Sequence, residues 1–286
     1  MKFENIRVFN FQGALRGMRN PKNSWNKSDS LFGFVDATNP DNVRDLLNEA
    51  KLSWAAEDSE ELALERKNWL YDNGMQFPYL HSNIAEFAFI GPNDLKLAQT
   101  LIRGGSEHRK FLRQIFVTVD ITAPLYLWKE FDTYKVGTVA NSTSTMHKID
   151  SKPITIDDFE IDDYQSYNNF LPDFLGEEGL SADDCETMIT RFIDFLEGLR
   201  QKYLETKDKR YWKELIRWLP ESYLQTRTVT MSYENLFAMC HQRDNHKLNE
   251  WSGKDDITKP NFIAFVKSLP YSEELIFITL LDNKTH

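Results

Sequence analysis

The chain has 286 residues, of which 41% are hydrophobic and 27% are charged, and its 34 Lys and Arg against 44 Asp and Glu give a net charge of −10. With 20 Phe, 11 Tyr and 7 Trp, it is too rich in aromatic residues to be disordered. The acidic balance excludes a general nucleic-acid binder, because attraction to phosphates needs clustered Lys and Arg. The longest apolar stretch, residues 275–281, is too short to cross a membrane and predicts a core strand or a helix end.

Cysteine usage predicts a reduced, cytoplasmic protein. Cys185 and Cys240 are far apart and stand in no Cys-x-x-Cys or Cys/His spacing, so we expect neither a structural zinc site nor another metal. The first residues lack the apolar run of a signal peptide, which favours the same compartment.

The first third of the chain predicts two strands and two helices. Residues 5–12 alternate loosely between apolar and polar and predict a strand, and a basic segment over 13–21 follows it and ends in a turn signal. Residues 31–36 predict a second strand. A plausible cap at Asn39 begins a helix, and a charged helical stretch over 58–71 comes after it.

The middle of the chain carries the clearest signals. Apolar residues at helical spacing predict a helix over 93–103, which Gly104 and Gly105 stop. Residues 115–122 are rich in β-branched side chains and predict the best strand of the chain. Residues 125–135 predict another helix.

An acidic insertion over about 153–180 separates this part from the C-terminal elements. Residues 153–190 contain 11 Asp or Glu and no Lys or Arg, together with too many Phe and Tyr for a solvated tail. A long helix is expected from Ser181 to about Lys207, with a buried stripe formed by Met188, Phe192, Phe195, Leu199 and Tyr203.

Three further elements follow the long helix. Residues 212–220 predict a short helix closed by proline, and residues 224–231 predict a strand. Ser232 is placed to cap another helix. Without repeats, linkers or low-complexity tracts, the sequence predicts a single α/β (α+β) domain over 1–286.

A local concentration of basic residues stands out in this acidic chain. Between residues 101 and 148 it is interleaved with hydroxyl residues, and it consists of His108, Arg109, Lys110, Arg113, Lys129, Lys135, His147 and Lys148. Binding of a phosphate or a nucleotide would explain such a segment. A solvated charged surface would give the same pattern.

The helix that begins after Ser232 places a cation on its apolar face. Arg243 lies seven residues after Leu236, and His246 continues the same line. A cation in that position must reach solvent, pair with an acid or meet an anionic ligand. His241 and His246 are five residues apart, which does not suit a pair of metal ligands on one helix face.

The segment Thr133–Met146 resembles the motif Arg-His-Arg-x-x-Ser-x-Asn-Glu-x-Ser-x-Arg of the flavin-dependent thymidylate synthases. With one extra residue before Asn141, Lys135 falls on the third basic position and Thr138 on the first serine. Asn141 and Ser144 fall on identical counterparts, and Glu130 on a glutamine that the family often has upstream.

Two other regions extend this resemblance to about residues 90–255. Residues 101–105 and 111–113 resemble the family's flavin-binding loop, with Arg113 where a histidine is usual. Downstream, Arg243, His246 and Glu250 resemble a row of arginine, histidine and glutamate. Arg217 stands near a nucleotide-binding arginine just before Leu-Pro.

The resemblance implies the family's fold, a central twisted sheet flanked by helices, assembled as a homotetramer. It also implies reductive methylation of dUMP to dTMP, with FAD as the cofactor and methylene-tetrahydrofolate and NADPH as co-substrates. The implied site residues are Ser144 and Glu130 for catalysis, Ser144 and Arg217 for the nucleotide, and Arg113, Lys135, Asn141, Arg243 and His246 for the flavin.

Four substitutions depart from the family's motif. Thr133 and Tyr134 stand where the motif has its first arginine and its histidine, and Ser142 and Met146 replace its glutamate and its closing arginine. These changes leave two alternatives to thymidylate synthesis: flavin-dependent alkylation of another pyrimidine nucleotide, and a non-catalytic nucleotide-binding homologue.

Overall fold

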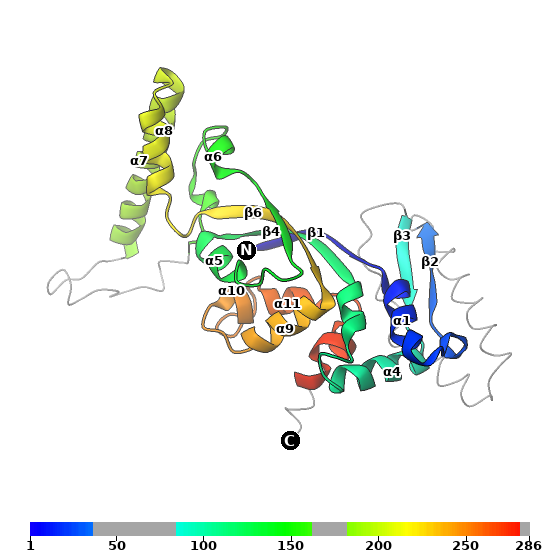
Figure 1. Cartoon of the computed structure of the whole chain (residues 1–286). Coiled ribbons are helices and arrows are strands. Elements are labelled where there is room, and N and C mark those ends of the chain that lie inside the picture. Colours follow the sequence, from blue (N-terminus) through cyan, green and yellow to red (C-terminus); the bar gives the residue numbers. More distant parts are fainter. Residues whose placement is uncertain (37–83, 162–181, 281–286) are drawn as a thin grey trace. The chain divides into compact units, whose positions relative to one another are not determined.

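The computed structural model describes residues 1–36, 84–161 and 182–280 (Figure 1). The contacts within the chain divide it into two compact units. Unit 1 comprises residues 1–2, 121–133 and 141–227, and unit 2 comprises residues 3–120, 134–140 and 228–286. The single-domain prediction over 1–286 therefore stays a prediction. The predicted helices at 39–50 and 58–71 and most of the acidic insertion lie outside the described residues.

The mixture of helices and strands confirms the predicted α/β (α+β) class. The strands are β1 (Lys2–Phe9), β2 (Leu31–Asp36), β3 (Ile84–Phe89), β4 (Phe116–Pro124), β5 (Val139–Ser142) and β6 (Leu224–Ser232). The helices are α1 (Phe11–Arg19), α4 (Pro92–Arg103), α5 (Leu125–Phe131), α6 (Thr145–Lys148), α7 (Ala182–Thr206), α8 (Lys209–Trp218), α9 (Tyr233–Arg243), α10 (Asn249–Ser252) and α11 (Phe262–Lys267). Short turns of helix lie at η1 (Asn20–Lys22), η2 (Trp25–Lys27), η3 (Lys110–Gln114), η4 (Ile156–Asp158) and η6 (Glu273–Phe277).

Four strands form a sheet in the order β1-β4-β6-β5, and β2 pairs antiparallel with β3 in a second sheet. On β4, the side chains of Val117 and Val119 are buried, whereas Thr118 and the other residues that alternate with them are only partly buried. Thr118 bonds Thr230 across the strands at 2.9 Å, and Thr122 bonds Thr226 at 2.7 Å. From Thr118 to Thr122 the residue number rises along β4, while the number of the bonded partner on β6 falls from Thr230 to Thr226. The two strands therefore run antiparallel.

The predicted strands at 31–36, 115–122 and 224–231 and the helix at 93–103 are confirmed within a residue or two. The predicted helix at 125–135 ends earlier, at Phe131, because the chain turns at Asp132 and Thr133. The apolar stretch 275–281 lies in the helical segment that includes η6, so its helix-end alternative holds.

The sequence analysis assigned no secondary structure to the basic segment 13–21, and α1 makes most of it helical. Its buried residues Phe11, Ala14, Leu15 and Met18 fall at helical spacing. The segment contains two glycines, which are poor helix formers and mask this pattern in the sequence. Tertiary packing of the apolar face outweighs that propensity.

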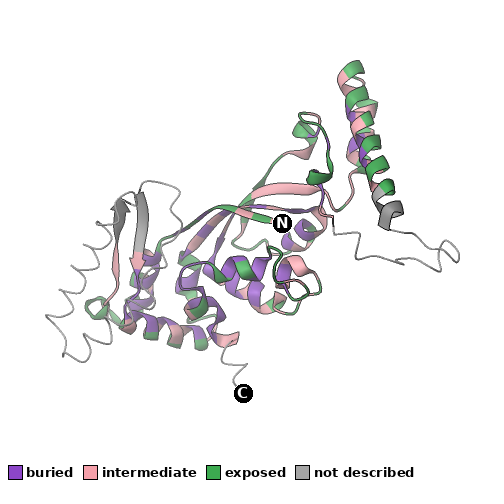
Figure 2. Ribbon diagram, turned by 180° about the vertical axis from the view of Figure 1, so that it is seen from behind, coloured by how far each residue is buried: buried purple, intermediate pink, exposed green. Residues whose placement is uncertain are grey.

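The predicted buried stripe of α7 is wrong for two of its residues, whereas Phe192 and Leu199 do pack against the buried apolar cluster. Met188 and Phe195 are 58% and 46% exposed, whereas Ile193 and Leu196 are buried. The true stripe is rotated around the helix because α7 packs against α8, with Leu215 buried between them in one apolar cluster. Figure 2 shows how much of α7 and α8 remains exposed.

The core of unit 2 lies around α9 and α11 (Figure 2). Leu236, Met239 and Cys240 of α9 are fully buried, as are Trp251 and Phe262. Burial also raises the pKa of the Cys240 thiol, which makes it an unreactive core group. Among the described helices, none is long and apolar enough to cross a membrane.

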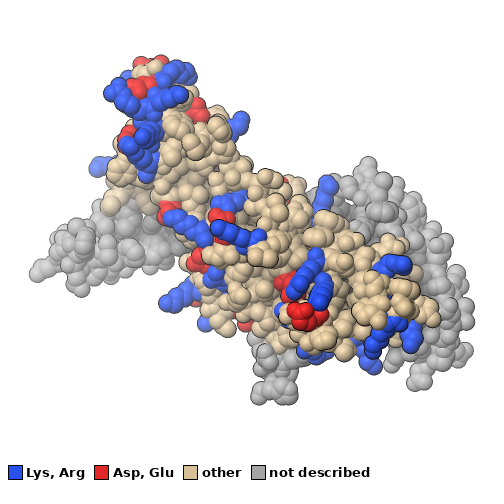
Figure 3. All heavy atoms as spheres, viewed as in Figure 1, with Lys and Arg blue, Asp and Glu red and all other residues tan. Residues whose placement is uncertain are grey.

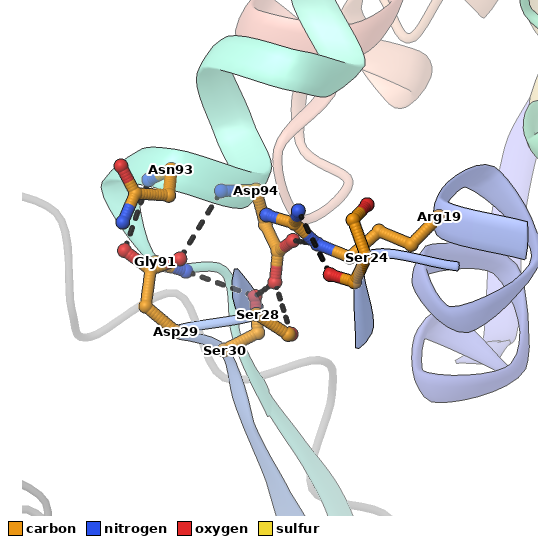
Figure 4. Close-up of polar contacts among 8 residues, drawn as sticks. All are labelled: Arg19, Ser24, Ser28, Asp29, Ser30, Gly91, Asn93 and Asp94. Atoms are coloured by element: carbon orange, nitrogen blue, oxygen red, sulfur yellow. Dashed lines mark hydrogen bonds and ion pairs between the residues drawn. The ribbon is translucent and has the colours of Figure 1, made fainter. Parts of the chain in front are cut away.

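A buried polar network fixes the start of α4 to the segment after α1 (Figure 4). Asp94 is fully buried, and its carboxylate accepts hydrogen bonds from Arg19 Nε, from Ser28 Oγ at 2.6 Å and from Ser30 Oγ. The Asp29 carboxylate accepts from the backbone N–H groups of residues 93 and 94 at 2.9 and 3.1 Å. Every donor and acceptor named here is satisfied, as a buried network requires.

Candidate functional site

The N-terminus of α9 holds the loop that follows α5. Ser232 and Asn235 form a capping box, which confirms the predicted cap. The Asn235 amide also donates to the backbone oxygen of Val136 at 2.7 Å. Next to it, Gly137 has φ of +78°, and a Cβ there would lie 3.1 Å from Asn235 Oδ1. The loop therefore approaches α9 at a position that only glycine fits without strain.

The hydroxyl of Thr138, the next residue, is buried without a hydrogen-bond partner among the described residues. A buried polar atom of this kind costs free energy until a donor or acceptor reaches it. Beside it, Lys135 is exposed and Val136 is 89% exposed. The loop thus offers a cation, an unsatisfied hydroxyl and an apolar surface, which together suit an anionic ligand with an apolar ring.

Arg243 at the end of α9 lies against two aromatic rings. Its Nε donates to the Tyr134 hydroxyl at 2.8 Å, and its guanidinium carbon is 5.0 Å from the centre of the Trp251 ring and 5.5 Å from that of Tyr134. Tyr134 in turn donates to Gln242 Oε1 at 3.0 Å. Cation–π contacts and a planar hydrogen bond therefore fix the orientation of the guanidinium.

His246 packs edge-on against the same tryptophan, with ring centres 6.4 Å apart. Its Nδ1 accepts from the backbone N–H of Leu248 at 3.2 Å, so the neutral ring carries its proton on Nε2. Unit 2 thus brings together Arg243 and His246, both predicted from the sequence, around Trp251. Tyr134 links them to the loop that carries Lys135.

Arg113 also belongs to unit 2, where it is exposed at the end of η3, an element that packs against α9. Two neighbouring cations of the basic segment are engaged with acids. Arg109 pairs with Glu234 at 2.9 Å, and Lys110 pairs with Glu107 at 3.2 Å. For these two residues the structure favours an ion-paired surface over a phosphate site.

His241 has a structural environment on α9. Its Nδ1 lies 2.7 Å from the Phe237 carbonyl oxygen and its Nε2 lies 2.7 Å from Thr279 Oγ1. Burial, and then the nearby Arg109 charge, lower the pKa of its imidazole. No group of side chains that could hold a metal ion occurs in the described part of the chain.

The other predicted site residues belong to unit 1. Ser144 caps α6 by accepting from the His147 N–H at 3.2 Å, and Asn141 is exposed on β5. Glu130 is half-buried on α5. Arg217 is exposed and pairs with Glu214 one turn earlier on α8.

Gln225 and Arg227 on β6 support this part of unit 1, and the sequence analysis did not place either residue in the site. Gln225 Nε2 donates to the Thr143 carbonyl and to Thr145 Oγ1, both at 3.2 Å, and so holds the residues on either side of Ser144. Arg227 pairs with Asp132 at 2.7 Å and lies 4.3 Å from the centre of the Trp128 ring. Alternating polar residues on β6 were the signal in the sequence that could have found both.

No protein-family model and no curated protein matches this chain. Among solved structures, Thymidylate Synthase X (ThyX) from Helicobacter pylori with FAD and dUMP aligns with 98% of this chain and 99% of its own, at 14% identity and a TM-score of 0.52. The chain has the ThyX fold.

A second structure of Helicobacter pylori ThyX, also complexed with FAD and dUMP, covers 65% of this chain and 83% of its own, at 17% identity and a TM-score of 0.41. The ThyX fold confirms the predicted fold and the resemblance on which it rested. At this identity the likeness concerns the fold. The roles of Ser144, Glu130 and the other predicted site residues remain predictions.

Proposed function

We propose that this protein is a ThyX-like enzyme that catalyses reductive methylation of the uracil nucleotide dUMP to dTMP with FAD, using methylene-tetrahydrofolate and NADPH as co-substrates. The observation that carries the proposal is the match of nearly the whole chain to a ThyX solved with FAD and dUMP. The family's assembly as a homotetramer comes with the proposal. Exposed Val139 and Met146, 66% and 55% exposed, suit a subunit contact.

The loop 134–140 fits a flavin nucleotide in its chemistry. Lys135 would pair with a phosphate, and the Thr138 hydroxyl would gain the hydrogen bond that it lacks among the described residues. Arg113 would supply a second charge, since it is exposed on η3. Arg243 and His246 would border the ring from their fixed positions around Trp251.

The bound flavin would supply the electrons for reduction, which protein side chains cannot do. The residues of this chain would bind and orient the nucleotide. Ser144 would hydrogen-bond it, Glu130 would orient the pyrimidine, and Asn141 would hydrogen-bond the flavin. Arg217 would release Glu214 and bind the base or the phosphate instead. Breaking this ion pair costs little free energy because the pair is exposed.

One observation favours a second candidate, flavin-dependent alkylation of a different pyrimidine nucleotide. Tyr134 stands where the family motif has a histidine, and its hydroxyl accepts the hydrogen bond from Arg243 Nε. A guanidinium held in this way presents fewer free donors to a substrate. On this second candidate, dTMP formation is slow or absent and another pyrimidine nucleotide is the preferred substrate.

Two measurements test the proposal. Purified protein incubated with FAD should retain the flavin through gel filtration, and Lys135→Ala should lower that retention while Lys96→Ala, which removes an exposed charge from α4, should not. Tritium release from 5-tritiated dUMP should then be measured with FAD, NADPH and methylene-tetrahydrofolate, and repeated with dCMP and UMP. Turnover with dCMP or UMP, together with no turnover of dUMP, identifies the second candidate.

A colourless protein that shows no heat on titration with FAD contradicts both enzymatic candidates. It would leave the non-catalytic nucleotide-binding homologue. Light scattering checks the assembly independently, because a tetramer has four times the mass of the chain. A monomer would contradict a site shared between subunits.

A further inference from the structure

Unit 2 contains a second feature that the proposed function does not use, an open pocket of about 1130 Å³. It lies among α1, η1, η2, α4 and η3. One part of its lining is apolar, formed by Met18, Pro21, Leu97, Leu101 and Phe111. None of its lining residues belongs to the Tyr134–Arg243–Trp251 cluster or to the loop 134–140.

The polar part of the lining is positively charged. It contains Arg19, Lys22, Lys27 and Lys110 against the single acid Glu107, in a chain whose net charge is −10. The rest of the polar lining comes from the imidazole of His108 and from the amide and hydroxyl side chains of Asn23, Ser24, Asn26, Asn93 and Thr100. Figure 3 shows Lys and Arg side chains over α1 and the segment that follows it.

Two of these four cations are already neutralised. Arg19 pairs with the buried Asp94, and Lys110 pairs with Glu107. The charge that remains for a ligand belongs to Lys22 and Lys27, which are both exposed. Each is the last residue of a short turn of helix, and both line the pocket.

The segment that carries these lysines is held in place by the buried network at Asp94 (Figure 4). Arg19 bonds Asp94 and reaches the Ser24 carbonyl at 3.4 Å, which fixes the segment between η1 and η2. The N–H groups of residues 93 and 94 at the start of α4 are taken by Asp29. An anion here would therefore be recognised by the lysines and not by the helix terminus.

We propose that this pocket binds a phosphorylated heterocycle, with the ring on the apolar wall and the phosphate between Lys22 and Lys27. The volume is sufficient, since small-molecule sites span about 300–1000 Å³. Apolar contact and charge-assisted hydrogen bonds would contribute together. The proposal goes beyond the pyrimidine site proposed above and does not depend on it.

Purine mononucleotides test the pocket apart from a pyrimidine site. AMP and GMP should bind in isothermal titration at low salt. Adenosine should bind more weakly because it lacks the phosphate, and inorganic phosphate should bind more weakly because it lacks the ring. The double variant Lys22→Ala/Lys27→Ala should weaken AMP binding at least tenfold, roughly the effect of one lost charge-assisted hydrogen bond. Lys96→Ala, the matched loss of an exposed charge on α4, should leave the affinity unchanged.

A second variant tests location without changing charge. Thr100→Tyr places a ring inside the pocket from the exposed side of α4, and it should abolish AMP binding while FAD retention is kept. The proposal is overturned if neither AMP nor GMP binds in the millimolar range, or if both variants bind AMP as the parent does. Loss of FAD retention in the double lysine variant would also overturn it, because the pocket would then belong to the flavin site.

Discussion

Two polar regions of unit 2 differ in how completely their groups are satisfied. At the start of α4, the buried Asp94 carboxylate receives three side-chain hydrogen bonds, and its partners are themselves fixed. In the loop 134–140, the Thr138 hydroxyl is buried without a partner among the described residues, and Lys135 points to an exposed surface. A closed network stabilises the fold, whereas an open one leaves capacity for a ligand.

Removing Asp94 should give the largest effect on stability. Asp94→Ala leaves a buried guanidinium and two serine hydroxyls without their acceptor, and breaking such a buried pair costs about 3–5 kcal/mol. Urea unfolding measures this loss, with Lys96→Ala as a surface control that should change little. A loss below about 1 kcal/mol would mean that the network is not closed in solution.

Replacing Arg243 should weaken FAD binding more than replacing its neighbour Tyr134. Arg243→Ala should weaken FAD binding by about 1–2 kcal/mol if its guanidinium borders the flavin, in the range of charge-assisted hydrogen bonds. Tyr134→Phe keeps the ring and removes the hydrogen bond from Arg243 Nε, and serves as the matched control. If Arg243→Ala lowers the melting temperature and leaves FAD affinity intact, the arginine is purely structural.

Glu197 tests the rule for closed networks in unit 1. Arg200, which is buried, donates to both oxygens of this carboxylate at 2.7 Å, and that hydrogen bonding lowers the pKa of Glu197 from 4.5 to about 2. Because the folded-state pKa lies below the ordinary value, the stabilisation is present above about pH 4.5 and is lost as the pH falls toward 2. Glu197→Gln should cost about 1–2 kcal/mol at pH 7, after allowance for partial solvent screening.

The check is urea unfolding of the parent and of Glu197→Gln at pH 7 and at pH 3. The difference between the two proteins should shrink at the lower pH. An equal difference at both values would mean that the carboxylate keeps an ordinary pKa in the folded protein.

Thr138 should show the smallest effect, and one of opposite sign for stability and binding. Thr138→Val removes a hydroxyl that has no partner within the described structure, so stability should hold or rise slightly, while FAD binding should weaken by up to about tenfold. Thr118→Val is the opposite case, because its hydroxyl bonds Thr230 at 2.9 Å. That variant should lose stability and keep its FAD binding. If the two variants behave alike, the distinction between a hydroxyl without a partner and a hydrogen-bonded hydroxyl is wrong.

The sequence predicted the elements whose signal is local. The strand at 115–122 is rich in β-branched residues and the helix after Ser232 has its cap, and both are present. The stripe of α7 was wrong at Met188 and Phe195 because burial there depends on the position of α8, and sequence periodicity cannot show which face a partner covers. The α1 helix was not predicted because its two glycines have a low helix propensity. Packing of its apolar face stabilises the helix nevertheless.

For the candidate site, the sequence indicated some of the residues but not the contacts between them. Arg243 was found from its place on the helix face, and it lies against Trp251. His246 was expected on the same face but lies beyond Arg243, where α9 ends, and it also packs against Trp251. The resemblance treated Tyr134 as a departure, yet it joins the loop to Arg243. The pairing of Arg109 with Glu234 crosses 125 positions of sequence, and no local pattern encodes it.

Asn235 carries one more consequence. A single amide closes the capping box of α9 and also holds the loop at Val136, so the first helical turn and the loop lose their anchors together. Slow amide hydrogen exchange should therefore appear in both segments as one cooperative opening, with shared protection factors. A ligand that orders the loop would slow exchange at the start of α9 without touching it, which makes that helix turn a remote reporter of occupancy.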